Sequence, residues 1–382
     1  MGELRAFSVR TPARSTAPAP AGAAPAYVVL PGDVDDATAP SGGNVYDRRL
    51  SQTLAAAGRP LRELPVRGAW PRPDGAAREA LARALAAVPD GAVVLLDGLV
   101  ACAVPEIVVP HTGRLRTAVL VHLPLADETG LGPAAAREHD ALERETLQAV
   151  SAVVATSPWA ARRIAERHAL PAGRVHVVVP GTDPAPLAPG TQDGARLLCV
   201  ASLTPRKGHD LLAGALAAVA DLPWTCRCVG PLGRDREHLA RVRELIARHG
   251  LGDRVELTGP LTGEPLAAEY AAADLLVLPS RAETFGMVVT EALMRGTPVL
   301  ATAAGGVPDA LGLAPDGTRP GLLVPPDDPD ELAAALRRWL DDAGLRDRLR
   351  AAARLRRGTL HGWEHAARDM DAVLELLREG TR

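Results

Sequence analysis

Short apolar runs alternate with helical stretches along the chain from Tyr27 onward. Runs such as GAVVLLD and TAVLVHL are apolar at nearly every position, which is typical of parallel strands buried on both faces. In the first half, the pattern predicts helices over residues 44–57 and 133–150. It predicts strands over residues 27–30, 62–66, 91–97, 117–123, 151–156 and 175–179.

The second half repeats this alternation. We expect strands over residues 196–201, 224–229, 255–257, 275–278, 298–301 and 321–324, and a helical tail over residues 330–377. Regular strand–helix repetition predicts an α/β fold with parallel sheets and right-handed crossovers. Between the halves, PGTDPAPLAPG at residues 180–190 can continue neither a helix nor a central strand, so we place a domain boundary there.

Length and composition agree with two domains. The chain has 382 residues, beyond the size at which a single core is usual. We expect a disordered Pro/Ala-rich leader at residues 1–25, a first domain at 26–180, a second at 181–358 and a C-terminal helix within 359–382. Apolar residues make up 47% and aromatic residues 3%, so Ala, Leu and Val must fill the cores.

Charge and cysteine usage narrow the functional classes. The net charge of −3, with no basic stripe, argues against nucleic-acid binding. No apolar run approaches the ~20 residues that cross a bilayer, and the leader has no apolar signal segment. The four cysteines form no C-x-x-C pair, which favours buried thiols in a reducing cytosol and no metal site, so we expect a cytoplasmic location.

One stretch carries two carboxylates around a turn, and it reads PSRAETFGMVVTEAL. Glu283 precedes the helix that we expect from Met287, and Glu291 lies about one turn inside it. Both should lie at the C-terminal edge of a parallel sheet, where open α/β sheets bind ligands. Backbone amides of Gly286, Met287 and Val288, after Phe285, would be helix-start donors for an oxygen-rich ligand. The alternative is an ordinary strand–helix unit with two surface glutamates.

The only lysine among the 43 basic residues is Lys207. It lies in VASLTPRKGHDLL, between an expected strand and a helix, again at the C-terminal edge of the sheet. A lysine and a neighbouring arginine, Arg206, suit the charge of a diphosphate. The alternative is a surface lysine without a binding role.

The first half offers a weaker set of candidates. Gly42 and Gly43 lie in PSGGN after the first strand, where glycines let a backbone approach a ligand closely; the alternative is a plain turn with Asn44 as helix cap. His122 follows a buried strand, and its alternative role is that of a hydrogen-bonded core histidine. Glu128 lies in the loop that follows.

Together these motifs resemble the retaining glycosyltransferases of the GT-B fold, in family 4. The resemblance implies two Rossmann-like domains with parallel sheets facing across a cleft, and a last helix that returns to the first domain. In that family Glu283 would contact the donor sugar, Glu291 the ribose, and Lys207 the diphosphate. The family pattern G-R-L-x-x-x-K-G has an arginine where this chain has Ser202, which leaves open whether Arg206 replaces it.

The same resemblance gives roles to the first domain. The double glycine would approach the donor, His122 would lie near the donor sugar as a catalytic residue, and Asn44, Tyr46 and Glu128 would bind the acceptor. The implied reaction moves a sugar from a nucleotide-sugar, UDP- or GDP-linked, to a glycan, glycolipid or small-molecule hydroxyl. We expect a front-face retaining mechanism without metal or other cofactor, and peripheral membrane contact is compatible with it. The alternatives are a non-catalytic sugar-nucleotide-binding protein, or a phosphorylase or epimerase on this fold.

Overall fold

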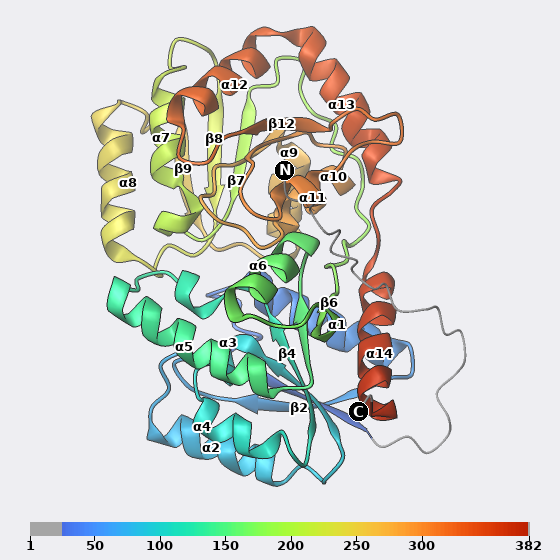
Figure 1. The fold of residues 1–382 in the computed structure, drawn as a ribbon. Helices are drawn as coiled ribbons and strands as arrows, with labels where there is room; N and C mark the ends of the chain where they lie inside the picture. Colours follow the sequence, from blue (N-terminus) through green and yellow to red (C-terminus); the bar gives the residue numbers. More distant parts are fainter. Residues whose placement is uncertain (1–24, 381–382) are drawn as a thin grey trace, which may run out of the picture. The chain divides into compact units, whose positions relative to one another are not determined.

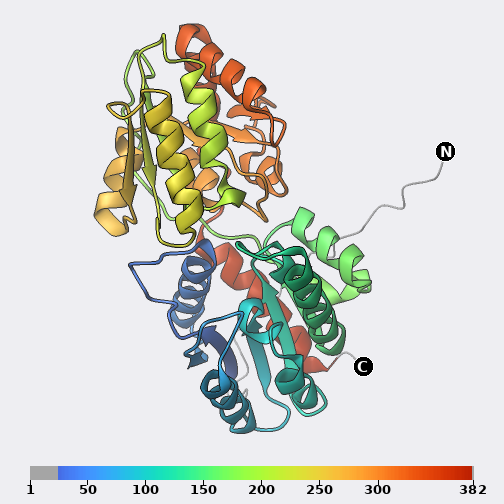
Figure 2. The same cartoon turned by 90° about the vertical axis from the view of Figure 1, so that its left-hand side faces the viewer.

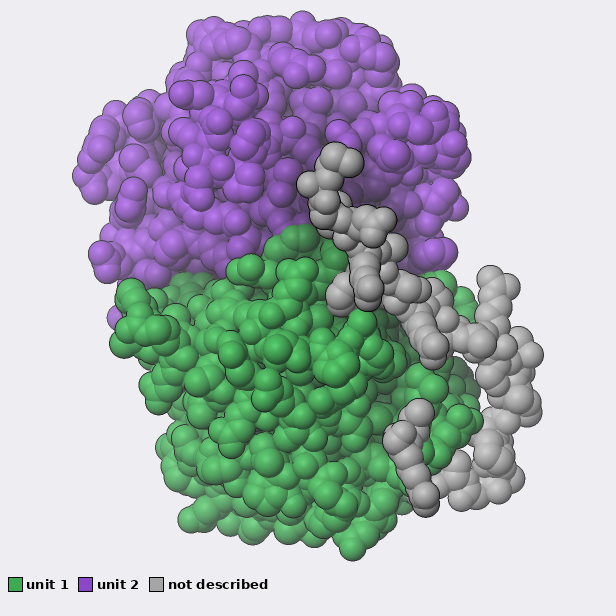
Figure 3. Space-filling model, viewed as in Figure 1, with its two compact units in different colours: residues 1–35, 43–181, 363–382 green, residues 36–42, 182–362 purple. Residues whose placement is uncertain are grey.

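The computed structural model describes residues 25–380, which form two compact units (Figure 3). Unit 1 contains the chain up to Asp35, Gly43–Gly181 and the chain from Trp363 onward. Unit 2 contains Asp36–Gly42 and Thr182–Gly362. The leader predicted at residues 1–25 lies, apart from Pro25, outside the described residues.

Unit 1 is built on a six-stranded parallel sheet in the order β2-β1-β3-β4-β5-β6 (Figure 1). Its strands are β1 (Ala26–Pro31), β2 (Leu61–Val66), β3 (Val93–Asp97), β4 (Arg116–Val121), β5 (Ala152–Ala155) and β6 (Val175–Val177). Its helices are α1 (Gly42–Ala56), α2 (Gly75–Ala86), α3 (Gly98–Ala101), α4 (Pro105–Val108), α5 (Pro133–Ala149), α6 (Pro158–His168) and α14 (Trp363–Glu379). Short 3-10 turns are η1 (Val109–His111), η2 (Leu125–Asp127) and η3 (Ala172–Arg174). The fully apolar segment of β3 is buried on both faces, as the sequence pattern predicted.

Unit 2 repeats the plan with the strand order β12-β11-β10-β7-β8-β9, also all parallel. Its strands are β7 (Arg196–Val200), β8 (Thr225–Val229), β9 (Val255–Gly259), β10 (Leu275–Leu278), β11 (Val299–Thr302) and β12 (Gly321–Val324). Its helices are α7 (His209–Ala217), α8 (Arg236–Arg248), α9 (Gly263–Ala272), α10 (Met287–Met294), α11 (Val307–Leu311), α12 (Pro329–Asp341) and α13 (Ala343–Arg357), with η4 (Pro205–Lys207) before α7. Figure 2 shows α7 and α8 side by side over one face of this sheet.

Each unit has its own core of Leu, Val and Ala, in keeping with the low aromatic content. All four side chains of β10 are at most 1% exposed. Burying one such Val or Leu stabilises the fold by about 1.5–3 kcal/mol. All four cysteines are buried and reduced, as predicted.

Several boundaries differ from the sequence predictions. Helix α1 begins at Gly42, so the two glycines form its first turn and Asn44 is not its cap. The helical tail is three helices, and the last of them, α14, packs against β3 and β4 of unit 1. The loop Asp36–Gly42, assigned to the first domain from sequence, groups with unit 2, where Arg234 donates a hydrogen bond to the carbonyl of Ala39. None of the helices within residues 25–380 is long and apolar enough to cross a membrane.

Candidate functional site

The strand order of unit 2 changes direction between β7 and β10. From this pair the chain adds strands outward in opposite directions, so β7 and β10 are the topological switch point of the sheet. Loops that leave the carboxyl ends of two such strands diverge to opposite faces and leave room for a ligand. Lys207 follows β7 and Glu283 follows β10, so both predicted residues lie at this point.

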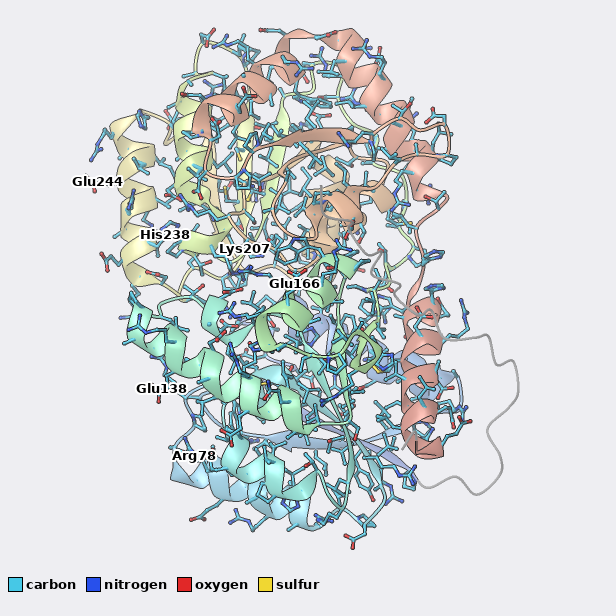
Figure 4. The ribbon with its side chains drawn as sticks, viewed as in Figure 1. Arg78, Glu138, Glu166, Lys207, His238 and Glu244 are labelled. Carbon is cyan, nitrogen blue, oxygen red and sulfur yellow. The ribbon has the colours of Figure 1, made fainter. Side chains whose placement is uncertain are left out.

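Lys207 and Glu283 form a direct ion pair there. The Nζ of Lys207 lies 2.5 Å from Oε1 of Glu283, and the hydroxyl of Ser280 donates to the same oxygen at 2.8 Å. The two side chains are only 16% and 8% exposed. Burial acts to raise the pKa of Glu283, but the charges of Lys207 and Arg206 outweigh it and hold that pKa below its usual value. The carboxylate is therefore ionised at neutral pH. Figure 4 labels Lys207 among the side chains of unit 2.

Arg206 joins the same group. Its NH1 lies 3.8 Å from Oε2 of Glu283 and donates to the carbonyl of Ala282 at 3.0 Å. Neighbouring side chains in an extended segment would point apart, but residues 205–207 form the 3-10 turn η4, which allows both cations to approach one carboxylate. The placement of Arg206 is thus compatible with its replacing the arginine that the family pattern has at residue 202. Lys207, Arg206 and Glu283 together carry a net charge of +1.

A close backbone contact explains the glycine after Lys207. Gly208 has φ +71°, and a Cβ added to it would lie 2.1 Å from the carbonyl oxygen of Pro279. Nearby, the amide of Arg281 donates to the carbonyl of Arg206 at 2.8 Å. Only glycine allows the loop after β7 to lie this close to the loop after β10, so the K-G pair has a steric reason as well as a chemical one.

Glu291 lies in the second turn of α10 and has a different environment. The hydroxyl of Tyr270 donates to its Oε2 at 2.6 Å, and the guanidinium of Arg295 stacks on the Tyr270 ring at 4.6 Å from the centroid. Burial raises the pKa of Glu291, opposed by the Tyr270 hydrogen bond and the Arg295 charge. Among the described residues, no group donates a hydrogen bond to the other oxygen of this carboxylate, so that oxygen can accept one from a ligand.

The turn between the two glutamates is held by Gly286 with φ +95°. Phe285 before it is buried at 6% exposure, so its side chain belongs to the core and only its backbone could touch a donor. The amide of Gly306, in the glycine pair after β11, donates to the carbonyl of Glu283 at 3.0 Å. The first-turn amides of α10, which include Met287 and Val288, have no acceptor inside the helix.

Unit 1 has its own switch point, between β1 and β3. The loop after β1 leads to Gly43, β3 ends at Asp97, and His122 follows β4 directly. The His122 ring lies against Gly43, where an added Cβ would be 3.1 Å from a ring carbon. Gly43 and His122, both predicted from the sequence to lie at this edge of the sheet, are therefore in contact in unit 1.

His122 lies between two buried aspartates. Its Nε2 is 2.8 Å from Oδ1 of Asp47, which belongs to α1, and 3.7 Å from Oδ2 of Asp97. Burial alone would lower the pKa of His122, but Asp47 and Asp97 raise it above its ordinary value. Burial, with the negative charge of Asp47, raises the pKa of Asp97 to about 8.

Tyr46 was wrongly predicted to bind an acceptor. It is 1% exposed, its hydroxyl donates to the carbonyl of Val178 at 2.9 Å, and its ring packs edge-on against His122 and Trp363. The sequence did carry a signal for this, because Tyr46 lies four and eight residues before Leu50 and Leu54, on the same buried helix face. Asn44 donates weakly to the carbonyl of Asp33, and Glu128 is half-buried after η2; their roles remain predictions.

Four contact residues were not identified from sequence: Ser280, Tyr270, Asp47 and Asp97. The aspartates left a signal, since Asp97 closes a buried strand and Asp47 shares the inward face of α1 with Leu50 and Leu54. The atoms of Asp47, Asp97 and His122 that could bind a metal all lie within 4.8 Å of one another. Nε2 of His122 and Oδ1 of Asp47 lie 2.8 Å apart, which is the distance of a direct hydrogen bond.

A separate surface depression of about 650 Å³ lies at the opposite, amino-terminal edge of the unit 2 sheet. Its wall includes Arg254, which stacks on Trp224 and donates to backbone carbonyls of residues 220, 222 and 224. These groups are occupied in holding the chain together. The depression is remote from the loops after β7 and β10, so we assign the candidate site to the switch point.

Known proteins resemble the chain both in sequence and in three-dimensional structure. Residues 189–356 match the family model described as glycosyl transferases group 1. A D-inositol 3-phosphate glycosyltransferase from Jonesia denitrificans is 32% identical over 257 residues, 62% of this chain and 59% of the relative. One from a Nocardioides species is 35% identical over 250 residues, 59% of this chain and 54% of the relative. The chain thus spans less than two thirds of the length of these relatives.

Solved structures match over nearly the whole chain. Sucrose-phosphate synthase from Thermosynechococcus elongatus has a TM-score of 0.75 at 25% identity, covering 92% of this chain and 98% of its own. Anabaena Alr3699/HepE, solved in complex with UDP-glucose, has a TM-score of 0.68 at 18% identity, covering 92% and 99%. Residues 189–356 are therefore similar to the glycosyl transferases group 1 family, within a chain that has the GT-B fold of glycosyltransferases.

Proposed function

We propose that this protein transfers a sugar from a nucleotide-sugar to a hydroxyl acceptor, with retention of anomeric configuration. The observation that carries the proposal is the group of Lys207, Arg206 and Glu283 at the switch point of unit 2. It combines cations suited to a diphosphate with an ionised carboxylate suited to sugar hydroxyls. The family match of residues 189–356 includes all three residues.

The contacts among Lys207, Arg206 and Glu283 support one mode of donor binding. A diphosphate would attract Lys207 and Arg206, which now share the carboxylate of Glu283. As their charge turns to the phosphate oxygens, Glu283 would be left ionised and would accept hydrogen bonds from the sugar. Glu291 would receive the ribose hydroxyls through the oxygen that Tyr270 does not occupy.

In the proposed reaction, the bond from the sugar C1 to the leaving phosphate oxygen breaks with its electron pair going to the diphosphate. The acceptor oxygen forms the new bond to C1 on the same face, and its proton passes to the leaving phosphate. Lys207 and Arg206 would stabilise the charge that grows on the diphosphate, which is the electrostatic contribution expected of such groups. We propose that His122 and Gly43 of unit 1 act near the sugar, and that no metal or other cofactor takes part.

A UDP-sugar is the first donor to test, because the structural neighbour HepE binds UDP-glucose. The relatives named for D-inositol 3-phosphate make a phosphorylated polyol hydroxyl the first acceptor class to test. The runner-up function is a sugar-nucleotide-binding protein without transfer, and Ser202 in place of the family arginine favours it.

Calorimetry with UDP, GDP, ADP and dTDP on the wild type and on Glu291→Ala tests the donor site. One nucleotide that binds tightly, and at least tenfold more weakly to the variant, supports the proposal. No binding by any of the four contradicts the donor-site assignment. Release of that nucleotide from its sugar conjugates, measured with and without acceptor, then separates transfer from binding alone.

A further inference from the structure

The histidine–aspartate cluster of unit 1 carries an inference beyond the proposed transfer reaction. It consists of His122, which is 18% exposed, and of Asp47 and Asp97, which are 2% and 4% exposed. Three facts about its hydrogen bonds fix where its protons lie.

The first fact concerns Asp97. Its Oδ1 accepts hydrogen bonds from the amides of Leu99 at 2.7 Å and Val100 at 3.3 Å, because Asp97 caps helix α3. Two amide donors make Oδ1 an acceptor, so any proton on this carboxyl group is carried by Oδ2. Oδ2 is the oxygen on the side of His122.

The second fact concerns Asp47. Its Oδ1 receives the hydrogen bond of His122, while its Oδ2 is buried with no hydrogen-bond partner among the described residues when both aspartates are ionised. A buried carboxylate oxygen without a donor is costly. The carboxyl groups of Asp47 and Asp97 lie within hydrogen-bonding range, so a proton on Asp97 would supply the missing donor.

The third fact concerns His122 itself. An ionised carboxylate has only acceptors, so the short contact requires a proton on Nε2. The ring is further confined by Gly43 on one side and by the edge-on ring of Tyr46 at 5.1 Å. Its orientation is therefore fixed by packing as well as by charge.

We propose that Asp47 and Asp97 are positioning residues that hold one proton between them and thereby fix the tautomer and orientation of His122. Asp97 is the carboxylic acid, Asp47 is the carboxylate, and His122 donates from Nε2 to Asp47. Two buried carboxyl groups in contact do not both ionise at neutral pH, which agrees with the raised pKa of Asp97. Only the kinetic consequence of this arrangement rests on the proposed function.

Other titratable groups around the cluster come from several elements of unit 1. They are Tyr46 on α1, Cys102 after α3, Glu143 on α5 beside Cys102, and Asp369 on α14 facing Tyr46. Tyr46 and Cys102 both have a pKa well above their usual range because they are buried, so neither is charged at neutral pH. Of the two aspartates, Asp47 makes the direct hydrogen bond to His122.

The test compares two substitutions that each replace a buried aspartate near His122 by asparagine. Asp97→Asn replaces a carboxylic acid by an amide that can still accept from the α3 amides and donate to Asp47. Asp47→Asn removes the carboxylate that His122 needs. We expect Asp97→Asn to leave the pKa and the tautomer of His122 nearly unchanged. We expect Asp47→Asn to lower the pKa of His122 by about one pH unit or more and to let its proton occupy either ring nitrogen.

Nitrogen-15 NMR of histidine-labelled full-length protein measures both effects, with the His122 signal assigned by its loss in His122→Gln. In the wild type, His122 should also sense a second titration near pH 8 from Asp97, and Asp97→Asn should abolish that step. A His122 pKa that falls as far in Asp97→Asn as in Asp47→Asn overturns the proposal. So does a wild-type signal with the proton on Nδ1 alone. If Asp47→Asn does not fold, the wild-type tautomer and the Asp97→Asn titration still decide.

Two further arms separate related explanations. Broadening of the His122 signal by micromolar Mn²⁺ would overturn the proposal in favour of a cation site. For the transfer reaction, we expect kcat/KM of Asp47→Asn to fall tenfold or more, with KM for the donor little changed. Absence of transfer with every donor would refute the proposed function, whereas the NMR result would still decide the proton arrangement.

Discussion

Replacing Lys207 by Met removes the cation from the ion pair with Glu283 while keeping the length of the side chain. Breaking a buried pair by removing one partner typically costs about 3–5 kcal/mol, because the remaining charge is left uncompensated. Glu283 keeps the Ser280 hydrogen bond and the more distant Arg206, so we expect the low end, about 3 kcal/mol. The same change should weaken nucleoside diphosphate binding about tenfold to a hundredfold, since hydrogen bonds to charged groups contribute about 1.5–3 kcal/mol.

The matched control is Glu283→Gln, alone and combined with Lys207→Met. We expect the single Glu283→Gln to cost about 2 kcal/mol and the double variant also about 2 kcal/mol, because the double variant leaves neither position 207 nor position 283 with an unpaired charge, and Arg206 is partly exposed. The singles then sum to about 5 kcal/mol, and the coupling between the two residues is about 3 kcal/mol, at the upper end for residues in contact.

Because the chain has two units, the assay must report on unit 2 alone. Hydrogen exchange of the amides in β7 and β10 under native conditions measures the opening free energy of that sheet. Glu283 has a lowered pKa in the folded protein, so its stabilising contribution is present above its unfolded pKa of about 4.3 and is lost as the pH falls through the folded value. In Lys207→Met that loss should begin at higher pH. Wild-type protection in Lys207→Met, or a double variant whose cost equals the sum of the singles, would refute this reasoning.

Gly208→Ala should lower the stability of unit 2 by several kcal/mol and abolish donor binding, because the added methyl group meets a carbonyl in a left-handed backbone; Gly214→Ala, in open space on α7, is the control and should stabilise by about 0.5–1 kcal/mol in thermal unfolding. Burial raises the pKa of Glu291, so the fold loses stability as the pH rises above the pKa that this group has in the unfolded chain. Glu291→Gln should therefore raise the melting temperature more at pH 8 than at pH 4, and calorimetry should show weaker nucleotide binding. Equal shifts of the melting temperature at both pH values would contradict this. Tyr46→Phe should cost about 1 kcal/mol in urea unfolding and leave the acceptor KM unchanged, whereas a raised KM would restore the acceptor role that we withdrew.

The strands and the two-domain plan were readable from the sequence because parallel strands buried on both faces leave uninterrupted apolar runs. The element after each run was also readable, so Lys207 and Glu283 could be placed at the same sheet edge before any coordinates. Their direct contact could not be predicted. It depends on β7 and β10 being neighbours in a sheet whose chain order separates them by two intervening strands.

The parts that were missed depend on helix phase and on partners far away in sequence. Tyr46 was misassigned although it is spaced four and eight residues before Leu50 and Leu54, so the helical pattern already placed it on their buried face. Tyr270 was missed because nothing near it in the sequence signals a contact with Glu291, 21 residues later. Arg206 is the sequence neighbour of Lys207, but the direction of its side chain could not be predicted. The 3-10 turn that directs both cations has no clear sequence signature.

Each unit thus buries a titratable cluster at its switch point, and in each the charges compensate one another within the unit. In unit 2 the compensation is between cations and Glu283, with one positive charge left over for an anionic ligand. In unit 1 His122 donates a hydrogen bond to Asp47, and in the arrangement proposed above Asp97 is neutral because it holds a proton. Buried charge is costly unless it is paired, so the fold can keep such groups only by pairing them with one another. A ligand that fits must therefore replace existing partners, and a nucleotide-sugar can do so in unit 2 because it carries both an anion for the cations and hydroxyl donors for the carboxylate.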